Sequence, residues 1–182
     1  GRDPGGAVTA RDAALAVAPE DARLHVHRAN ALTALRRWKE ALSACERGIA
    51  IDPGPSFPHF LQAELLLDLE RPAEAAAAAR AALECERRDP NAKPHAEVYH
   101  TLADALISLT RWNEAERELD GGLKAHPEHA ELSYLRGYAR FQQKREAEAR
   151  ADFDVACRRA PEEGYTWYGE EAAEPKPAAA PP

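Results

Sequence analysis

Apolar residues recur along most of the chain at the spacing of an α-helix. Two such stripes follow each other around Thr110-Arg111. The first contains Tyr99, Leu102, Ala103, Leu106 and Leu109, and the second contains Trp112, Ala115, Leu119 and Leu123. Residues three and four apart share one face of a helix, and Pro127 stops the second stripe. The pattern therefore predicts two amphipathic helices joined by a short turn.

This helical pair is one of four copies. A Glu-Ala dipeptide marks each copy, at Glu40-Ala41, Glu74-Ala75, Glu114-Ala115 and Glu148-Ala149. The alanines are 34, 40 and 34 residues apart, and a proline follows three of them by 12 residues. The second copy has six extra residues around 88–94, which predict a longer second helix and an Asp-Pro-Asn loop. Since one hairpin cannot bury its apolar face alone, the repetition predicts a stack.

Small residues occupy two further fixed positions in the repeat. The first lies 12 residues before each of these alanines, at Ala29, Ala63, Ala103 and Gly137. The second lies seven residues after it, at Gly48, Ala82, Gly122 and Ala156. Small side chains let helix backbones approach closely, and such packing tolerates little added volume. We therefore expect helix contacts at both positions.

The 34-residue pattern resembles the tetratricopeptide repeat family. Aromatic residues stand where that family favours them, at Trp38, Trp112 and Phe153. The resemblance implies an all-α fold, a right-handed α-α superhelix (solenoid) of stacked helical hairpins. Its four repeats would fill residues 20–161, as units 21–54, 55–94, 95–128 and 129–161.

The expected ends are less regular than the units. We expect a disordered start (1–6) and a half-repeat helix that caps the N-terminal side (7–19). A C-terminal capping helix (162–171), which contains Trp167, and a Pro/Ala-rich disordered tail (172–182) would follow the last unit.

Four polar residues depart from the family pattern. Arg28, Gln62 and Arg136 occupy the position of Leu102 in the third unit, and Arg140 replaces an expected tyrosine in the fourth. Long polar side chains can lay their stems along apolar surface and keep their heads in water. We expect that arrangement here.

Composition narrows the classes of partner. The chain has 45% hydrophobic residues and a net charge of -7, and five glutamates against one lysine follow Pro161. No basic stripe for nucleic acid is visible, and no apolar run is long enough to insert into a membrane. The three cysteines, Cys45, Cys85 and Cys157, are an odd and widely spaced set. They suggest no disulfide framework and favour a reducing, cytoplasmic location.

The candidate chemistry points away from an enzyme, a metal site or a cofactor. His25 and His27 are two residues apart and face different sides of a helix. His126 and His129 have no further His or Cys at ligand spacing nearby. Cys45 and Cys157 fall on packing positions of the repeat. With no Gly-rich phosphate loop or nucleophile elbow, we expect no catalytic residues, no metal ligands and no cofactor.

The family resemblance implies that the first helices of the units line a concave groove. The candidate partner-binding residues at those positions are Asn30, Phe57, Phe60, Leu61, Glu64, Asp68, His100, Asp104, Tyr134, Tyr138 and Phe141. One specialisation of the family clamps the C-terminal carboxylate of chaperones. Only Asn30 matches the residues it needs, so we do not expect that ligand.

The sequence predicts a protein-protein interaction module or scaffold that binds a peptide or helix in the groove. Aromatic anchors often dominate binding energy, and the acids between them favour a partner with apolar anchors and basic flanks. Two alternatives stay open. The array could self-assemble or join a larger complex through its repeat ends, and the groove aromatics could be covered by the chain's own end or by a second copy.

Overall fold

The computed structural model describes residues 4–88 and 93–165. Within those residues the chain is all-α, without strands. The α-helices are α1 (Pro4–Val17), α2 (Ala22–Ala34), α3 (Trp38–Ile51), α4 (Ser56–Asp68), α5 (Pro72–Arg87), α6 (Ala96–Ser108), α7 (Trp112–Ala125), α8 (Ala130–Gln142) and α9 (Glu146–Arg159). A short 3-10 helix, η1 (Pro161–Glu163), follows them. This architecture confirms the predicted fold class.

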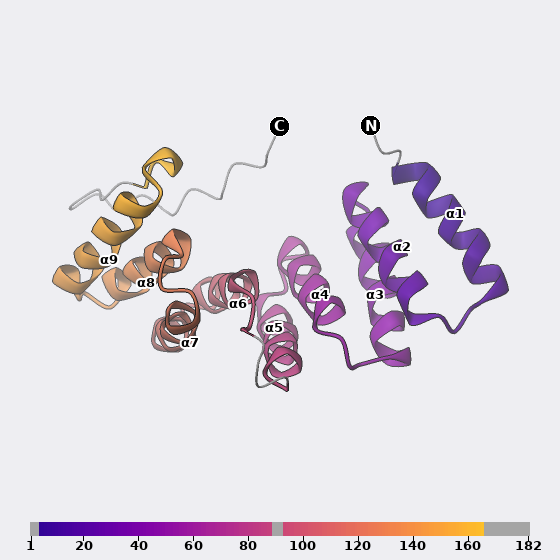
Figure 1. Ribbon diagram of the computed structural model, residues 1–182, viewed down its shortest axis with the longest axis horizontal. Coiled ribbons are helices and arrows are strands. Elements are labelled where there is room, and N and C mark those ends of the chain that lie inside the picture. The colour runs from indigo at the N-terminus through magenta and orange to yellow at the C-terminus, as the bar shows by residue number, and fades with distance from the viewer. Residues whose placement is uncertain (1–3, 89–92, 166–182) are drawn as a thin grey trace.

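The helices form a curved row of hairpins (Figure 1). α2 packs on α3, α4 on α5, α6 on α7 and α8 on α9, and each hairpin also packs on the next. The first helices touch one another along the row, α2 with α4, α4 with α6 and α6 with α8. In Figure 1, α4 and α6 lie on the inner side of the arc, whereas α5 and α7 lie on the outer side. Residues of the first helices therefore share one surface.

The turn inside each hairpin has the same geometry in all four. Arg36, Glu70, Thr110 and Lys144 adopt positive φ angles of 56°, 57°, 56° and 63°. The N–H of the following arginine bonds to a carbonyl five residues earlier, as in a helix end closed by a left-handed residue. That arginine also holds the glutamate of the Glu-Ala pair, for example Arg71 Nε to Glu74 Oε1 at 2.7 Å. The glutamate of each Glu-Ala pair therefore serves to hold the arginine of the turn before it.

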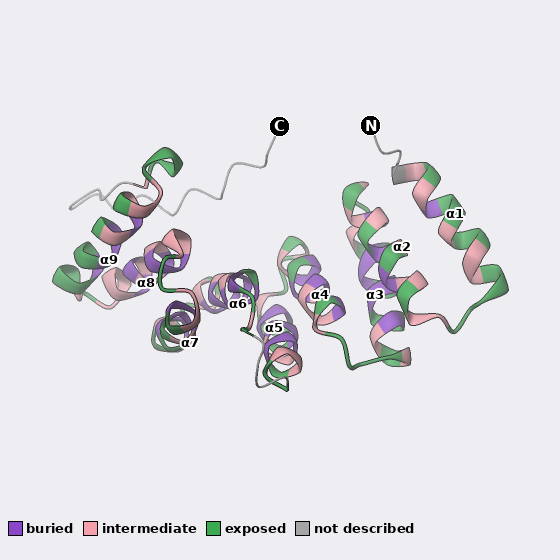
Figure 2. Cartoon of the chain, in the orientation of Figure 1, coloured by how far each residue is buried: buried purple, intermediate pink, exposed green. Residues whose placement is uncertain are grey.

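The small repeat positions lie at close helix contacts. Ala29, Ala63 and Ala103 are fully buried. A Cβ atom added at Gly48 would lie 2.7 Å from Val26 Cγ2, and one added at Gly122 would lie 2.9 Å from Tyr99 Cγ. Burial follows the seams between the helices (Figure 2). The expectation of close backbone approach at these positions therefore agrees with the structure.

Both ends carry structure beyond the four hairpins. α1 begins at Pro4, earlier than the expected start at residue 7, and packs on α2. After α9, η1 is followed by Gly164, which has a φ of 66°. Most of the expected capping helix (162–171), with Trp167, and the whole expected tail (172–182) lie outside the described residues. Those expectations stay predictions.

The arginines of the fourth unit are not arranged as expected. The side chains of Arg136 and Arg140 are only 22% and 16% exposed, and both pair with Asp152, which is buried. Their guanidinium heads therefore lie inside an ion-paired cluster instead of in water. The expectation that these heads lie in water is wrong, because α9 supplies a buried carboxylate that was not predicted.

Candidate interaction surface on the inner helices

The candidate residues all come from the first helices, which together form what we call the inner face. α2 carries Asn30, α6 carries His100 and Asp104, and α8 carries Tyr134, Tyr138 and Phe141. The other five, Phe57, Phe60, Leu61, Glu64 and Asp68, lie on α4. Leu61 is only 3% exposed and supports this face from the core. The other ten keep exposed or half-buried side chains.

α4 offers the most accessible apolar surface of the inner face. Phe57 is 48% exposed, one of two large apolar side chains in the described residues with that much exposure. Phe60, one turn further, is half-buried and packs against the core. Glu64 and Asp68 continue along the same helix and are exposed. α4 therefore presents an aromatic end and an acidic end.

His100 lies among carboxylates from two neighbouring helices. Its Nε2 is 3.0 Å from Glu131 Oε1 on α8, and its Nδ1 is 3.6 Å from Asp104 Oδ2 on α6. The His100 side chain is 27% exposed. The pair with Glu131 spans the junction between the third and fourth hairpins.

Three acids of the inner face have raised pKa values although their side chains reach solvent. Burial raises the pKa of Glu64, and the nearby negative charge of Asp68 raises it further. Burial likewise raises the pKa of Asp68 and of Asp104. Glu131 differs, because its hydrogen bond with His100 lowers its pKa. A cationic group placed beside Glu64, Asp68 or Asp104 would therefore relieve unfavourable charge.

The aromatic residues of α8 are largely engaged within the chain. The ring of Tyr138 meets Trp112 edge-on with centroids 6.0 Å apart. Tyr134 packs on Phe153 at 5.2 Å and on Tyr165 at 4.9 Å. The chain's own C-terminal segment thus covers Tyr134, one of the alternatives left open above. The expected capping segment (162–171) includes Tyr165, but the contact of Tyr165 with Tyr134 was not predicted. Trp167, the other aromatic residue of that expectation, lies outside the described residues.

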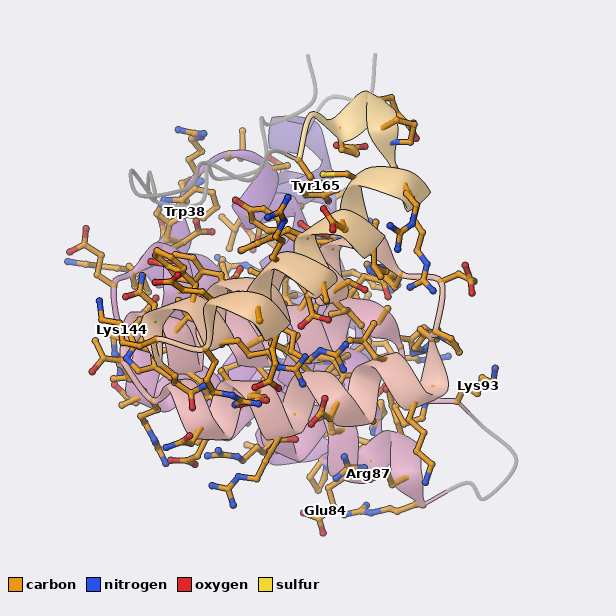
Figure 3. All side chains as sticks on the ribbon, turned by 90° about the vertical axis from the view of Figure 1, so that its left-hand side faces the viewer. Trp38, Glu84, Arg87, Lys93, Lys144 and Tyr165 are labelled. Atoms are coloured by element: carbon orange, nitrogen blue, oxygen red, sulfur yellow. The ribbon has the colours of Figure 1, made fainter. Side chains whose placement is uncertain are left out.

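The backbone at Tyr165 is held by α9. Cys157 Sγ donates a hydrogen bond to the Tyr165 carbonyl at 2.7 Å. Burial raises the pKa of the Tyr165 hydroxyl to about 12, so the ring stays neutral at any ordinary pH. Figure 3 shows Tyr165 on the upper side of the molecule, opposite Glu84 and Arg87 on the lower side. Tyr165 therefore covers part of the inner face at α8.

A second feature lies at the turn of the first hairpin. A shallow hollow of about 290 Å³ is lined by Trp38, Leu69, Arg36, Arg37, Lys39 and Glu40. The Arg36 guanidinium carbon lies 6.0 Å from the centre of the Trp38 ring. Trp112 has the same repeat position as Trp38, but Tyr138 covers it. At the position of Tyr138, the second unit has Glu64, so Trp38 lacks an equivalent aromatic neighbour.

Among the described residues no three His, Cys, Asp or Glu side chains are grouped so that they could hold a metal ion. His25 and His59 play one structural role in consecutive units, because their Nε2 atoms lie 2.8 and 3.1 Å from the carbonyls of Pro19 and Pro53.

Burial raises the pKa of Cys45 to about 12, which leaves its thiol unreactive. The described helices also include none with the length and apolarity that a bilayer span requires.

These observations define a helical-repeat protein built from stacked hairpins with equivalent turns. The sequence model of the tetratricopeptide repeat family matches residues 1–54 and 100–163, more than half of the chain. The chain therefore belongs to the tetratricopeptide repeat family. No curated protein sequence matches it.

Solved structures share the fold at low sequence identity. A crystal structure of MamA is 14% identical, with a TM-score of 0.81 over 89% of this chain and 91% of that chain. MamA from Desulfovibrio magneticus RS-1 is 14% identical, with a TM-score of 0.78 over 87% and 86%. YrrB, described as a TPR protein with an unusual peptide-binding site, is 19% identical, with a TM-score of 0.77 over 89% and 80%. At such identities the likeness establishes the fold alone.

Proposed function

We propose that this chain is an interaction module that binds a peptide or helix along its inner face. The tetratricopeptide fold generally serves as a scaffold for protein interaction, and the peptide-binding site of YrrB occurs on a related fold. The observation that carries the proposal is on α4, where Phe57 is exposed beside half-buried Phe60. Neither a catalytic constellation nor a cofactor is part of this proposal.

The chemistry of α4 also indicates the kind of partner. Phe57 and Phe60 would receive an apolar anchor, since partly buried aromatics are common centres of binding energy. Glu64 and Asp68 follow them; both are exposed, and burial of part of each side chain raises the pKa of each carboxyl group. A lysine or arginine next to the anchor would compensate that charge and speed association. We therefore propose a ligand segment with apolar anchors and basic flanks.

A random peptide display library selected on the whole chain tests this function. Selected peptides should carry an apolar residue next to Lys or Arg. Phe57→Ala and Phe60→Ala should each weaken their binding, measured by calorimetry, by more than about 1 kcal/mol. Salt at about 0.5 M should slow association through screening.

Two controls make this experiment decisive. Phe57 is the better probe of the face, because Phe60 also packs against the core and its loss could loosen the fold. Glu84→Ala changes an exposed residue of α5 on the opposite side of the molecule and should leave binding unchanged (Figure 3). Selected peptides that bind the Phe57 and Phe60 variants as tightly as the unmodified chain would exclude the inner face of α4.

A structural role is the second candidate. Val17, at the end of α1, is 86% exposed and leaves apolar surface at one end of the row. Copies could therefore stack through their repeat ends or join a larger complex. Light scattering distinguishes this role, because a monomer at every concentration counts against self-assembly. The thiols of Cys45, Cys85 and Cys157 are all free, which supports a reducing compartment such as the cytoplasm for either function.

A further inference from the structure

The junction between the third and fourth hairpins contains an ion pair that depends on a proton. His100 of α6 contacts Glu131 of α8 at 3.0 Å, and α6 and α8 pack directly on each other. Asp104, one turn along α6, lies 3.6 Å from the other ring nitrogen. A carboxylate therefore lies near each nitrogen of the ring. A protonated imidazole can donate from both nitrogens at once, whereas a neutral one can donate from only one.

The surroundings of His100 favour its charged form. Burial lowers the pKa of His100, but the hydrogen bond to Glu131 and the negative charges of Asp104, Glu131 and Glu64 raise it by more. The net pKa lies above that of an unperturbed histidine. The pairing also lowers the pKa of Glu131, as expected for two groups that stabilise each other's charge.

We propose that His100 is a proton-operated clamp that joins the third hairpin to the fourth. In its charged form the ring links α6 to α8 through Glu131 while Asp104 faces its second nitrogen. Loss of the proton removes one donor and one positive charge, so the junction loosens. This inference goes beyond the proposed function and requires no partner.

The sign of the pH effect follows from the direction of the shift. A histidine whose pKa is raised by folding stabilises the fold fully below its unfolded value, near about 6.5. That contribution disappears as the pH rises through the higher pKa of the folded state. The clamp is therefore closed below about pH 6.5 and opens at a higher pH, where folded His100 loses its proton.

Other titrating groups face the clamp. α4 contributes Glu64, α6 contributes Asp104, and α8 contributes Glu131. Before α8, His129 has a pKa lowered by burial, so its protonation acts against folding and opposes His100. The raised pKa values of Glu64 and Asp104 act in the same direction as His100, but at lower pH. The pH dependence of the free energy of unfolding therefore has contributions from several groups. Only a variant of His100 separates the contribution of the clamp from the others.

Opening the clamp would also change the inner face. When the ring is neutral, the charges of Asp104, Glu131 and Glu64 remain without the positive charge among them. The centre of the inner face then becomes more negative by one charge. A pH change across the pKa of His100 would therefore alter both the junction and the local potential.

The first test is a pH titration of the imidazole signals of the unmodified chain by NMR, with the His100 signal assigned through its bonds to the backbone. We expect His100 to titrate above about 6.5, and Glu131→Gln to shift its pKa downward. Glu146→Gln removes one negative charge from an exposed position of α9 and should leave the titration unchanged. A pKa at or below the unperturbed value, or no response to Glu131→Gln, would overturn the proposal.

The second test measures the junction. The melting temperature of His100→Gln should fall below that of the unmodified chain by more at about pH 6 than at about pH 9. His27→Gln, at an exposed position of α2, should show no such pH-dependent difference. An equal loss at both pH values would mean that His100 packs at the junction without acting through its proton. Because the NMR titration uses the unmodified chain, a variant that folds poorly does not remove the test.

Discussion

The third and fourth hairpins fill the same repeat positions with opposite chemistry. In the third, Leu102 and Leu106 are fully buried on α6. In the fourth, the equivalent residues of α8 are Arg136 and Arg140. Both hairpins nevertheless form the same helical pair with the same turn (Figure 1). One packing geometry therefore accepts either leucines or arginines, provided that the arginines have partners.

The partners come from two helices, α7 and α9. Arg136 Nη2 lies 2.6 Å from Asp152 Oδ1, and Arg140 Nη1 lies 2.8 Å from Asp152 Oδ2. Arg140 Nε also donates to Glu116 Oε1 of α7 at 2.9 Å, and Arg145 donates to the other oxygen of Glu116. Asp152 and Glu116 are both buried. A buried ion pair adds little net stability over apolar packing, but the loss of one partner is costly. The two hairpins should thus respond differently to mutation.

Asp152→Ala should produce the largest loss of stability. It leaves Arg136 and Arg140, only 22% and 16% exposed, without their shared carboxylate. Loss of one partner of a buried pair costs about 3–5 kcal/mol. Chemical denaturation measures the loss, and Asp154→Ala, at an exposed position of the same helix, is the control. A loss as small as that of Asp154→Ala would mean that the ionic cluster contributes nothing to holding α8 on α9.

Gly122→Ala should have the next largest effect and tests the junction of the two regions. The new Cβ would lie 2.9 Å from Tyr99 Cγ and 3.0 Å from Leu132 Cδ1. Such overpacking costs about 1–3 kcal/mol, more than alanine's advantage over glycine in a helix.

Gly121→Ala is the matched control for this change. Its Cβ would meet Tyr99 Cε1 at 3.5 Å, an ordinary contact, so helix propensity should make it neutral or stabilising. Equal effects of the two substitutions in denaturant would show that α7 does not approach α6 and α8 closely at Gly122.

The sequence predicted the hairpins because the information is local. The stripe through Leu102 and Leu106, the Glu-Ala turns and the fixed small residues all lie within one 34-residue unit. The ionic cluster was not predicted, because Arg140 and its partner Glu116 are 24 residues apart on different helices. The arginines at apolar positions were visible, but their partners appear only when α7, α8 and α9 are placed together.

The candidate surface shows the same limit. The family register placed His100, Asp104 and the α4 residues on one set of helices. It did not reveal that Glu131 would pair with His100, or that Tyr165 would cover Tyr134. Tyr165 lies after α9, beyond the short 3-10 helix, where the repeat pattern no longer predicts the position of a residue. The register also could not predict that Leu61 is buried in the core whereas Phe57, on the same helix, is exposed.

Acid should separate the fourth hairpin from the second, which is built from α4 and α5. Burial raises the pKa of Glu116, but hydrogen bonds from Arg145, Arg140 and Gln143 lower it by more. A carboxylate with a lowered pKa stabilises the fold above its unfolded value and loses that contribution as the pH falls through its folded value. Below about pH 4.5, amide protection should therefore fall in α8 and α9 before α4 and α5, whose contact is apolar. Hydrogen exchange that weakens equally in both hairpins would contradict this order.

The smallest effect should come from the Arg–Glu turn pairs, which all four hairpins share. Arg71 and Glu74 are 44% and 58% exposed, so their ion pair is screened by solvent. Glu74→Gln should barely change the melting temperature, and added salt should change it little. Glu148→Gln makes the same change in the fourth hairpin, but Arg145 there also holds buried Glu116. If the ionic cluster depends on the position of Arg145, Glu148→Gln should lower the melting temperature more than Glu74→Gln. Equal melting temperatures would show that Glu116 alone keeps Arg145 in place.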